Sequence, residues 1–394
     1  MSRPSNPFFF KGNIPDAYFC DREAETELLT RHIANGHNVV LTSPRRIGKT
    51  GLINHCFQQE FLKEHYYLFF VDILATSSLK EFTYLFGQEL FDTLKPQSRK
   101  MMDTFLSTVR SISGELKYDM ASGMPKFSFS LGALRDPEYT LKEIFEYINK
   151  ADKPCVIAID EFQQIAHYPE KNMEALLRTH IQHCSNAQFI FAGSERHLLT
   201  EMFNNVSRPF YASSTMMNLD KLEVRKYVDF LDLHFKEYHK NVVAEEAEAI
   251  YKLLTGNTFC LQKTFNVAFS MVDEGATCDS SIMLQAVEDI LLENEHTYKM
   301  MLSTLSPQPK EVLFAIASDG KANRVTSGDF VRRHQLKSSS SVQSAIKQLL
   351  DGDWITHYSD ENNNKTYIIN DPFLQLWLLK QIGQGYQLEE CFFR

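Results

Sequence analysis

The stretch Ser43-Pro44-Arg45-Arg46-Ile47-Gly48-Lys49-Thr50 decides how the rest of this sequence is interpreted. It follows residues 38–42 (NVVLT), a β-branched run typical of a buried strand, and it leads into residues 49–61, whose apolar positions recur at helical spacing. A loop between a strand and a helix can turn its backbone amides towards a phosphate, and the start of the helix adds further donors. The stretch therefore predicts a phosphate-binding loop.

Each position of this loop has an expected part. Gly48 lets the backbone wrap a phosphate, Lys49 reaches the outer phosphates, and the hydroxyl of Thr50 ligates magnesium. Ser43 departs from the pattern G-x-x-x-x-G-K-[ST], since its β-carbon has to fit the turn, and reduced nucleotide affinity is one expected consequence. The residues expected to contact the nucleotide are Ser43, Pro44, Arg45, Arg46, Ile47, Gly48, Lys49, Thr50 and Gly51.

A pair of acids follows the apolar run at residues 155–160 (CVIAID), which predicts a buried strand. Ligands of open α/β sheets bind at the carboxyl ends of the strands, so Asp160 is expected to hold magnesium. Glu161, one residue on, is expected to orient the attacking water. The alternative is a helix cap with a solvated neighbour, which the position about 110 residues after Thr50 disfavours.

A third candidate position comes after residues 188–192 (QFIFA), a strand expected beside the one that carries Asp160. There Gly193 and Ser194 end the strand, and the hydroxyl of Ser194 is a candidate to contact the γ-phosphate or the water. A simple strand-to-helix cap at Ser194 is the competing interpretation.

The order of the elements predicts an α/β fold with a parallel sheet, followed by two smaller domains. We expect a phosphate-binding core over residues 1–215, an all-helical lid over residues 216–304 and a winged helix-turn-helix domain over residues 305–394. The core pattern holds at least four strands, with an inserted hairpin or loop at residues 111–131. The pattern of the last domain predicts three helices followed by a hairpin. The strand signals of the core are residues 38–42, 68–73, 155–160 and 188–192.

The composition of the chain excludes several classes of protein. With 394 residues, 43% of them hydrophobic, and a net charge of -9, the chain is neither disordered nor a general coat for nucleic acid. Its seven scattered cysteines form no disulfide or zinc pattern. We therefore expect a cytoplasmic protein without a signal peptide or membrane span. His167, His180 and His183 approach metal-like spacing but lack a matching carboxylate or cysteine pattern.

Together these motifs resemble the archaeal-type ATPase family, a branch of the AAA-like P-loop ATPases often grouped with the STAND NTPases. The string Phe19-Cys20-Asp21-Arg22-Glu23-Ala24-Glu25 is similar to the F-x-x-R-x-x-E start of that family, and Asp160-Glu161-Phe162-Gln163 to its acidic box. The resemblance implies a P-loop NTPase core, ATP or ADP with Mg²⁺, and contacts of Phe19 and Arg22 near the adenine.

The resemblance also implies an arginine shortly after a P-[LF]-Y string, a position that this chain does not fill with an arginine. Here Pro209-Phe210-Tyr211 is followed by Ala212, and the nearest basic residue is Arg208. Arg208 is thus the candidate to reach a γ-phosphate, in its own chain or across an interface. The alternative is a surface arginine paired with an acid.

The winged-helix region carries a local excess of five positive charges between residues 321 and 347, which differs in sign from the whole chain. DNA is one expected partner, but acids at or near the wing, Asp351, Asp353, Asp360 and Glu361, would repel phosphate. A protein partner is the alternative, and oligomerisation is left open. The basic residues are Lys321, Arg324, Arg332, Arg333, Lys337 and Lys347.

The sequence therefore favours an enzyme that hydrolyses Mg-ATP and couples its nucleotide state to the lid and the winged helix. Two alternatives stay open. One is a nucleotide-gated DNA- or protein-binding regulator with little or no hydrolysis, and the other is a sequence-specific regulator in which the nucleotide is structural. Transfer of phosphate to a small acceptor is disfavoured, because Glu161 suits water activation and no acceptor motif is present.

Overall fold

The computed structural model describes residues 4–12, 14–94, 107–111, 115–118, 125–128, 130–359 and 364–383. The chain divides into two compact units, Asn13–Asp220 on the one hand and Met1–Gly12 with Lys221–Arg394 on the other. Within the described part of the chain, no helix is long and apolar enough to cross a membrane.

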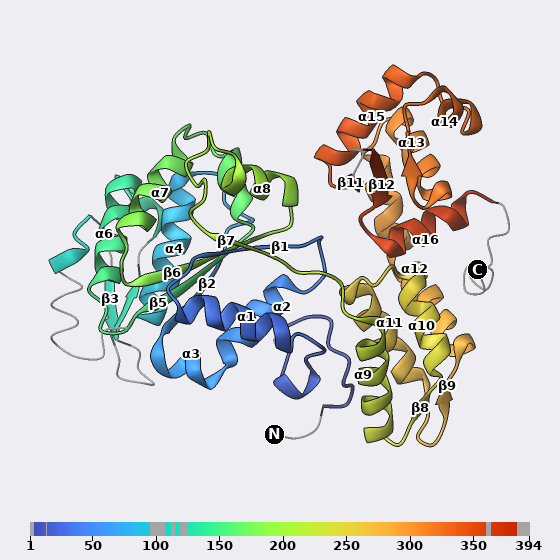
Figure 1. The fold of residues 1–394 in the computed structure, drawn as a ribbon, viewed down its shortest axis with the longest axis horizontal. Helices are drawn as coiled ribbons and strands as arrows, with labels where there is room; N and C mark the ends of the chain where they lie inside the picture. The colour runs from blue at the N-terminus through green and yellow to red at the C-terminus, as the bar shows by residue number, and fades with distance from the viewer. Residues whose placement is uncertain are drawn as a thin grey trace. The chain divides into compact units, whose positions relative to one another are not determined.

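A five-stranded parallel sheet forms the centre of the unit Asn13–Asp220, with the strand order β2-β5-β6-β1-β7 (Figure 1). This confirms the expected α/β class. The fifth strand, β7, lay outside the sequence expectation, because it is a four-residue edge strand with exposed ends and no apolar run. The strands are β1 (Val39–Thr42), β2 (Tyr67–Asp72), β5 (Cys155–Asp160), β6 (Ala187–Gly193) and β7 (Thr215–Asn218).

Helices cover both faces of this sheet because its strands are apolar on both sides. One face packs against α1 (Glu23–Ala34), α2 (Lys49–Gln58) and α3 (Glu60–His65). The single helix expected over residues 49–61 is wrong, since Gln59 has an extended backbone that separates α2 from α3. The opposite face packs against α4 (Leu79–Thr93), α6 (Pro137–Asn149), α7 (Met173–His183) and α8 (Arg196–Asn204).

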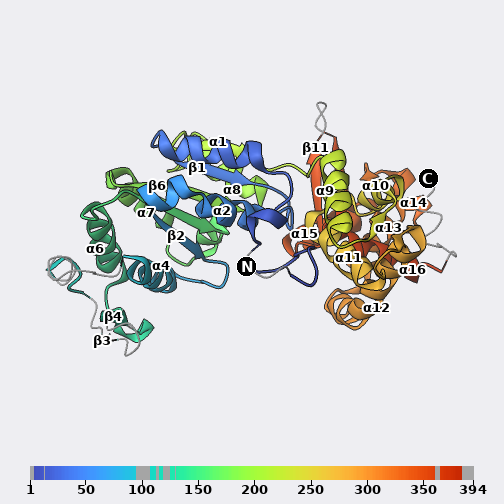
Figure 2. The same ribbon diagram turned by 90° about the horizontal axis from the view of Figure 1, so that it is seen from below.

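An antiparallel hairpin occupies part of the segment where the sequence predicted an insertion. Its strands are β3 (Glu115–Tyr118) and β4 (Pro125–Ser128), and Figure 2 shows it beside α4. Residues 112–114, 119–124 and 129 of the expected hairpin lie outside the described residues. In the described part of this unit, short 3₁₀ turns lie at Asp16–Tyr18 (η1), Leu131–Ala133 (η2) and Phe162–His167 (η3).

The second unit begins with four helices, α9 (Val224–Glu237), α10 (Ala244–Leu253), α11 (Thr258–Met271) and α12 (Ser280–Ser303). The expectation of an all-helical region is wrong in one detail. Two-residue strands β8 (Asn241–Val242) and β9 (Thr277–Cys278) pair in parallel and join two loops. Strands this short leave no periodic signal in the sequence.

The N-terminal residues pack into these helices and do not belong to the unit that holds the sheet. Phe8 is fully buried among aromatic rings, 5.5 Å from Phe235 and 5.6 Å from Phe269 between centroids. The Asn6 amide donates to the Asn266 carbonyl at 2.8 Å, and the Asn266 amide donates to the Phe8 carbonyl at the same distance. The first residues thus form part of the helical core.

A winged helix completes the second unit. Its helices are α13 (Pro307–Asp319), α14 (Gly328–Arg333) and α15 (Ser339–Asp351), followed by α16 (Pro372–Gln381). The expected hairpin is present as β11 (Ile355–Ser359) and β12 (Lys365–Ile369). A third strand that the sequence did not predict, β10 (Ala322–Asn323), pairs with β12 in the antiparallel direction. Ser338 and Ser341 form a capping box that fixes the start of α15. Residues 360–363 of the wing lie outside the described residues.

Candidate functional site

The loop from Ser43 to Gly48 connects β1 to α2 at the carboxyl end of the sheet. Left-handed backbone occurs at Gly48, with a φ of 107°, and at Arg46, with a φ of 63°. Ser43 is not among the positive-φ residues, although it is completely buried. The β-carbon of Ser43 therefore fits without a left-handed backbone, and the turn adopts its left-handed conformations at Arg46 and Gly48 instead.

Ser43 has a specific contact that glycine would lack. The Lys49 ammonium donates to Ser43 Oγ at 3.4 Å, and this hydroxyl donates to the Pro44 carbonyl at 2.8 Å. Burial lowers the pKa of Lys49, and the charge of Arg45 lowers it further, while Glu161 and Asp160 act in the opposite direction. Lys49 is thus a buried cation held at the base of the loop.

Thr50 and Asp160 meet at the end of β5. Thr50 Oγ1 donates to Asp160 Oδ2 at 2.6 Å. This hydrogen bond joins the first turn of α2 to the end of β5. Asp160 is only 5% exposed, and this burial raises the pKa of its carboxyl group. A hydroxyl beside a carboxylate is a donor set that suits Mg²⁺, so these two side chains fit the ion expected there.

Glu161 follows directly, in a left-handed conformation with a φ of 54°. Its Oε2 accepts from Gln163 Nε2 at 2.6 Å, from Ser194 Oγ at 2.9 Å and from Ser194 N at 3.3 Å. Burial by itself would raise the pKa of Glu161, but these hydrogen bonds and the charge of Lys49 outweigh it and lower the pKa. Glu161 is therefore a carboxylate in a fixed position.

Gln163 also belongs to this site, although its place in the acidic box implied no role for it. It is 2% exposed and reaches Glu161 from η3. Gly193 lets it do so, because a β-carbon at that position would collide with the Gln163 side chain. In the sequence, Gln163 could have been found by its position two residues after Glu161, and Gly193 by its position directly before Ser194.

The two residues expected near the adenine lie beside the loop. The Phe19 ring stacks on His55 of α2, with centroids 4.2 Å apart, and it also lies 3.4 Å from the point where a β-carbon on Gly51 would be. Arg22 is 4% exposed, and its guanidinium donates to the Ile47 carbonyl at 3.5 Å and to the Asp220 carbonyl at 2.7 Å. It therefore joins the loop to the end of this unit.

The arginines differ in what they contact. Arg45 lies within the loop, and its Nε donates to Ser194 Oγ at 3.3 Å. Arg208 instead pairs with Glu174 of α7 and Glu201 of α8, each at 2.8 Å. Lys49, Thr50, Asp160, Glu161, Ser194 and Arg45 are thus brought together, whereas the contacts that the structure gives for Arg208 are with α7 and α8.

Comparison with known proteins agrees with this architecture. The family model described as an ATPase domain predominantly from Archaea matches residues 19–263, and a model described as a probable winged helix domain matches residues 296–380. A search among proteins of curated function gives no significant match.

Several solved structures share the fold. The Walker-type ATPase PABY2304 of Pyrococcus abyssi is 21% identical, with a TM-score of 0.65 over 95% of this chain and 99% of that chain. The ORC2 protein of Aeropyrum pernix, in its ADPNP-ADP complexes, is 14% identical, with a TM-score of 0.59 over 96% and 98%.

The ORC1 protein of Aeropyrum pernix in complex with DNA is 13% identical, with a TM-score of 0.51 over 96% and 97%. The expected P-loop ATPase core, helical region and winged helix are confirmed. Since the family model covers more than half of its length, this chain belongs to the family of ATPase domains found predominantly in Archaea.

Proposed function

We propose that this protein hydrolyses Mg-ATP by attack of water on the γ-phosphate. One observation carries the proposal. Glu161 is fixed by Gln163 and Ser194 beside the buried Lys49 and the Thr50–Asp160 pair, at the carboxyl end of a parallel sheet. This arrangement supplies a cation for phosphate, oxygen ligands for a metal and a carboxylate for water.

Each side chain then has a defined part in the reaction. The ammonium of Lys49 binds the β- and γ-phosphates, and Glu161 orients a water and accepts its proton as the new P–O bond forms and the bond to the ADP leaving group breaks. Thr50 and Asp160 would hold magnesium, which neutralises phosphate charge when bound. Ser194 contacts the water or the γ-phosphate. Phe19 and Arg22 are proposed to lie on the adenine side.

Coupling of nucleotide state to the second unit is proposed to pass through Arg22. Its guanidinium contacts the carbonyls of Ile47 in the loop and of Asp220, the residue after which the chain enters the second unit. A nucleotide that moves the loop would alter the contact at this crossing. Different contacts in the ATP and ADP states would then bias the positions of the helical lid and the winged helix.

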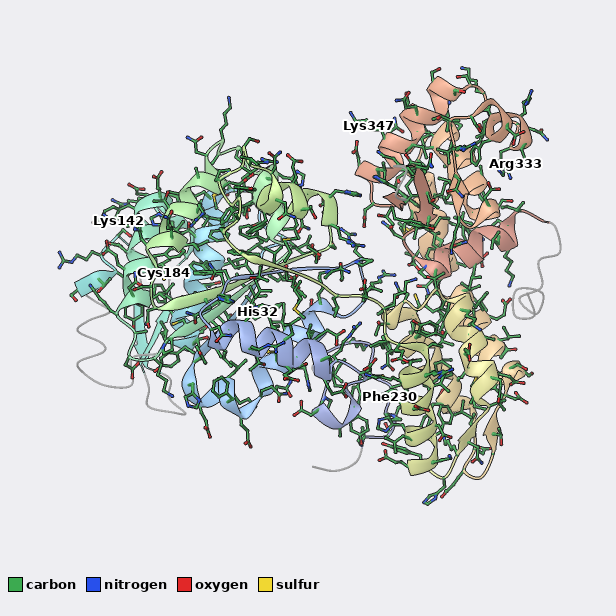
Figure 3. The ribbon with its side chains drawn as sticks, in the orientation of Figure 1. His32, Lys142, Cys184, Phe230, Arg333 and Lys347 are labelled. Atoms are coloured by element: carbon green, nitrogen blue, oxygen red, sulfur yellow. The ribbon has the colours of Figure 1, made fainter. Side chains whose placement is uncertain are left out.

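A DNA or protein partner is proposed for the exposed face of α15. Figure 3 shows Lys347 of α15 and Arg333 of α14 projecting from opposite sides of the winged helix, so these two basic residues do not share one face. Arg333 is also paired with Asp319 at 3.0 Å. The exposed residues of α15 that could donate to phosphate or bases are Ser339, Ser340, Gln343, Ser344, Lys347 and Gln348.

The proposed activity is tested by phosphate release from Mg-ATP with the wild type and Glu161→Gln, with and without duplex DNA. A nucleotide-binding titration of both proteins accompanies it. Turnover that disappears in Glu161→Gln while binding persists is the expected result, and stimulation by DNA would assign the winged helix a sensing role. Binding without turnover in the wild type would contradict hydrolysis and favour the nucleotide-gated regulator.

Arg208 as an arginine that reaches the γ-phosphate stays a prediction. Reaching a phosphate would require its guanidinium to leave both Glu174 and Glu201. The contacts that the structure describes favour a role in joining α7 to α8.

A further inference from the structure

Arg45 is among the residues that the sequence predicts to contact the nucleotide, but the proposed reaction gives it no specific part. It is exposed, and its Nε donates to Ser194 Oγ at 3.3 Å. The same hydroxyl donates to Glu161 Oε2 at 2.9 Å. A chain of two hydrogen bonds through Ser194 therefore connects Arg45 to the carboxylate proposed to orient the water.

The positive charge of Arg45 lies close enough to the Lys49 ammonium for the two groups to interact electrostatically. Its charge disfavours the charged form of Lys49, so the two positive groups act on each other. The carboxylates of Glu161 and Asp160 oppose this effect on Lys49, and both also accept hydrogen bonds, Asp160 from Thr50 and Glu161 from Gln163 and Ser194. Two neighbouring cations of this kind are stabilised by an anion placed between them.

Two other arginines considered for this site, Arg22 and Arg208, have contacts of a different kind. Arg22 is buried on two backbone carbonyls, and Arg208 is held by two carboxylates. Arg45 has the geometry that a terminal phosphate needs, because it comes from the loop that wraps the phosphates and points to Ser194 at the neighbouring strand end. Its planar guanidinium can bind two oxygens of one phosphate group.

We propose that Arg45 recognises the γ-phosphate of ATP within its own chain and thereby distinguishes ATP from ADP. The inference rests on the proposed nucleotide-binding function. With ATP, Arg45 binds the γ-phosphate oxygens and releases Ser194. With ADP there is no such group, and Arg45 keeps its hydrogen bond to Ser194.

The test compares the affinities for ATP and ADP in the full-length protein carrying Glu161→Gln, so that ATP is not consumed during the titration. Arg45→Ala is expected to weaken ATP binding about 10- to 100-fold and to change ADP binding about 2-fold or less. Arg45→Lys keeps the charge but loses the paired donors, so it should recover part of the ATP affinity. Arg135→Ala, which removes an exposed arginine just before α6, is the matched control and should alter neither affinity.

Three outcomes overturn the inference. Equal loss of ATP and ADP affinity would make Arg45 a general phosphate contact, and unchanged affinities would remove it from the site. If the Glu161→Gln protein and the wild type bind neither nucleotide, the proposed function fails as well. Thermal unfolding of each variant, compared with the parent, checks that Arg45→Ala retains the fold.

Discussion

At the level of single residues, Ser43 shows how a departure from a motif can be absorbed. The substituted position keeps ordinary backbone geometry, and its hydroxyl accepts a hydrogen bond from the Lys49 ammonium. The loop therefore holds its lysine through a side chain that glycine does not have. In the proposed function, this hydrogen bond would compete with phosphate for Lys49.

Replacement Ser43→Gly tests this competition. Without the hydroxyl, Lys49 should be freer to bind phosphate, so we expect ATP affinity to rise about 3-fold, the size of a weak hydrogen bond. The free energy of unfolding should fall by about 0.5–1 kcal/mol because glycine is more flexible in the unfolded chain. Calorimetric titration and urea unfolding measure the two effects. Weaker ATP binding would show instead that the Ser43 hydroxyl contacts the nucleotide.

At the level of elements, the adjacent ends of β5 and β6 supply the side of the candidate site that faces the loop between β1 and α2. Strand β5 supplies Asp160, and β6 supplies Gly193 just before Ser194. The two strands pair in parallel, so their ends meet at one edge of the sheet. The close approach of Gln163 to Gly193 then lets Gln163 hold Glu161.

Replacement Gly193→Ala tests this approach. The added methyl group would collide with the Gln163 side chain and with Leu199, so we expect a loss of about 1–3 kcal/mol in the free energy of unfolding. Gly132→Ala is a matched control, because the nearest atom to its β-carbon would be 3.8 Å away. Urea unfolding of both variants measures the difference. Equal stability of the two would contradict the packing described here.

Arg208 joins α7 to α8 through Glu174 and Glu201, and its replacement tests that role. Arg208→Ala should lower the free energy of unfolding by about 1 kcal/mol, because it leaves the half-buried Glu174 without its cation. ADP affinity should not change. Differential scanning calorimetry with an ADP titration checks both. Unaltered stability together with sharply reduced turnover would point instead to a γ-phosphate contact.

The sequence predicted these elements where a local pattern existed and missed them where the structure depends on distant contacts. The strands before Ser43 and Glu161 carry strong apolar patterns and were placed within about one residue, and the start of the helix at Lys49 was also predicted, although that helix ends at Gln58 and not at residue 61. The edge strand β7 and the pair β8–β9 are too short for a pattern. The role of Gln163 depends on a neighbour 30 residues later in the chain, Gly193, which no local pattern reveals.

At the level of the whole molecule, the chain passes between its two units twice. It crosses once between Gly12 and Asn13 and again between Asp220 and Lys221. The N-terminal residues belong to the helical unit through Phe8 and the paired Asn6 and Asn266. The segment that carries Phe19 and Arg22 is therefore tied at both ends, which gives the helical unit a second covalent connection to the proposed adenine side.

Phe8→Ala tests this attachment. Removing a completely buried ring should cost about 3–5 kcal/mol in the free energy of unfolding of the helical unit. Phe61→Ala, which truncates a 44% exposed ring, should cost much less and serves as the control. Hydrogen exchange of the amides in α9 and α11 reports on the helical unit alone. Unchanged protection there would show that residues 4–12 do not stabilise it.

The most direct test of the account is hydrolysis of Mg-ATP in water enriched in ¹⁸O. We predict that the wild type forms inorganic phosphate carrying one solvent oxygen, since water attacks the γ-phosphorus, and that Glu161→Gln binds ATP but forms almost none. Wild-type protein that binds ATP yet releases no labelled phosphate would contradict the proposed reaction.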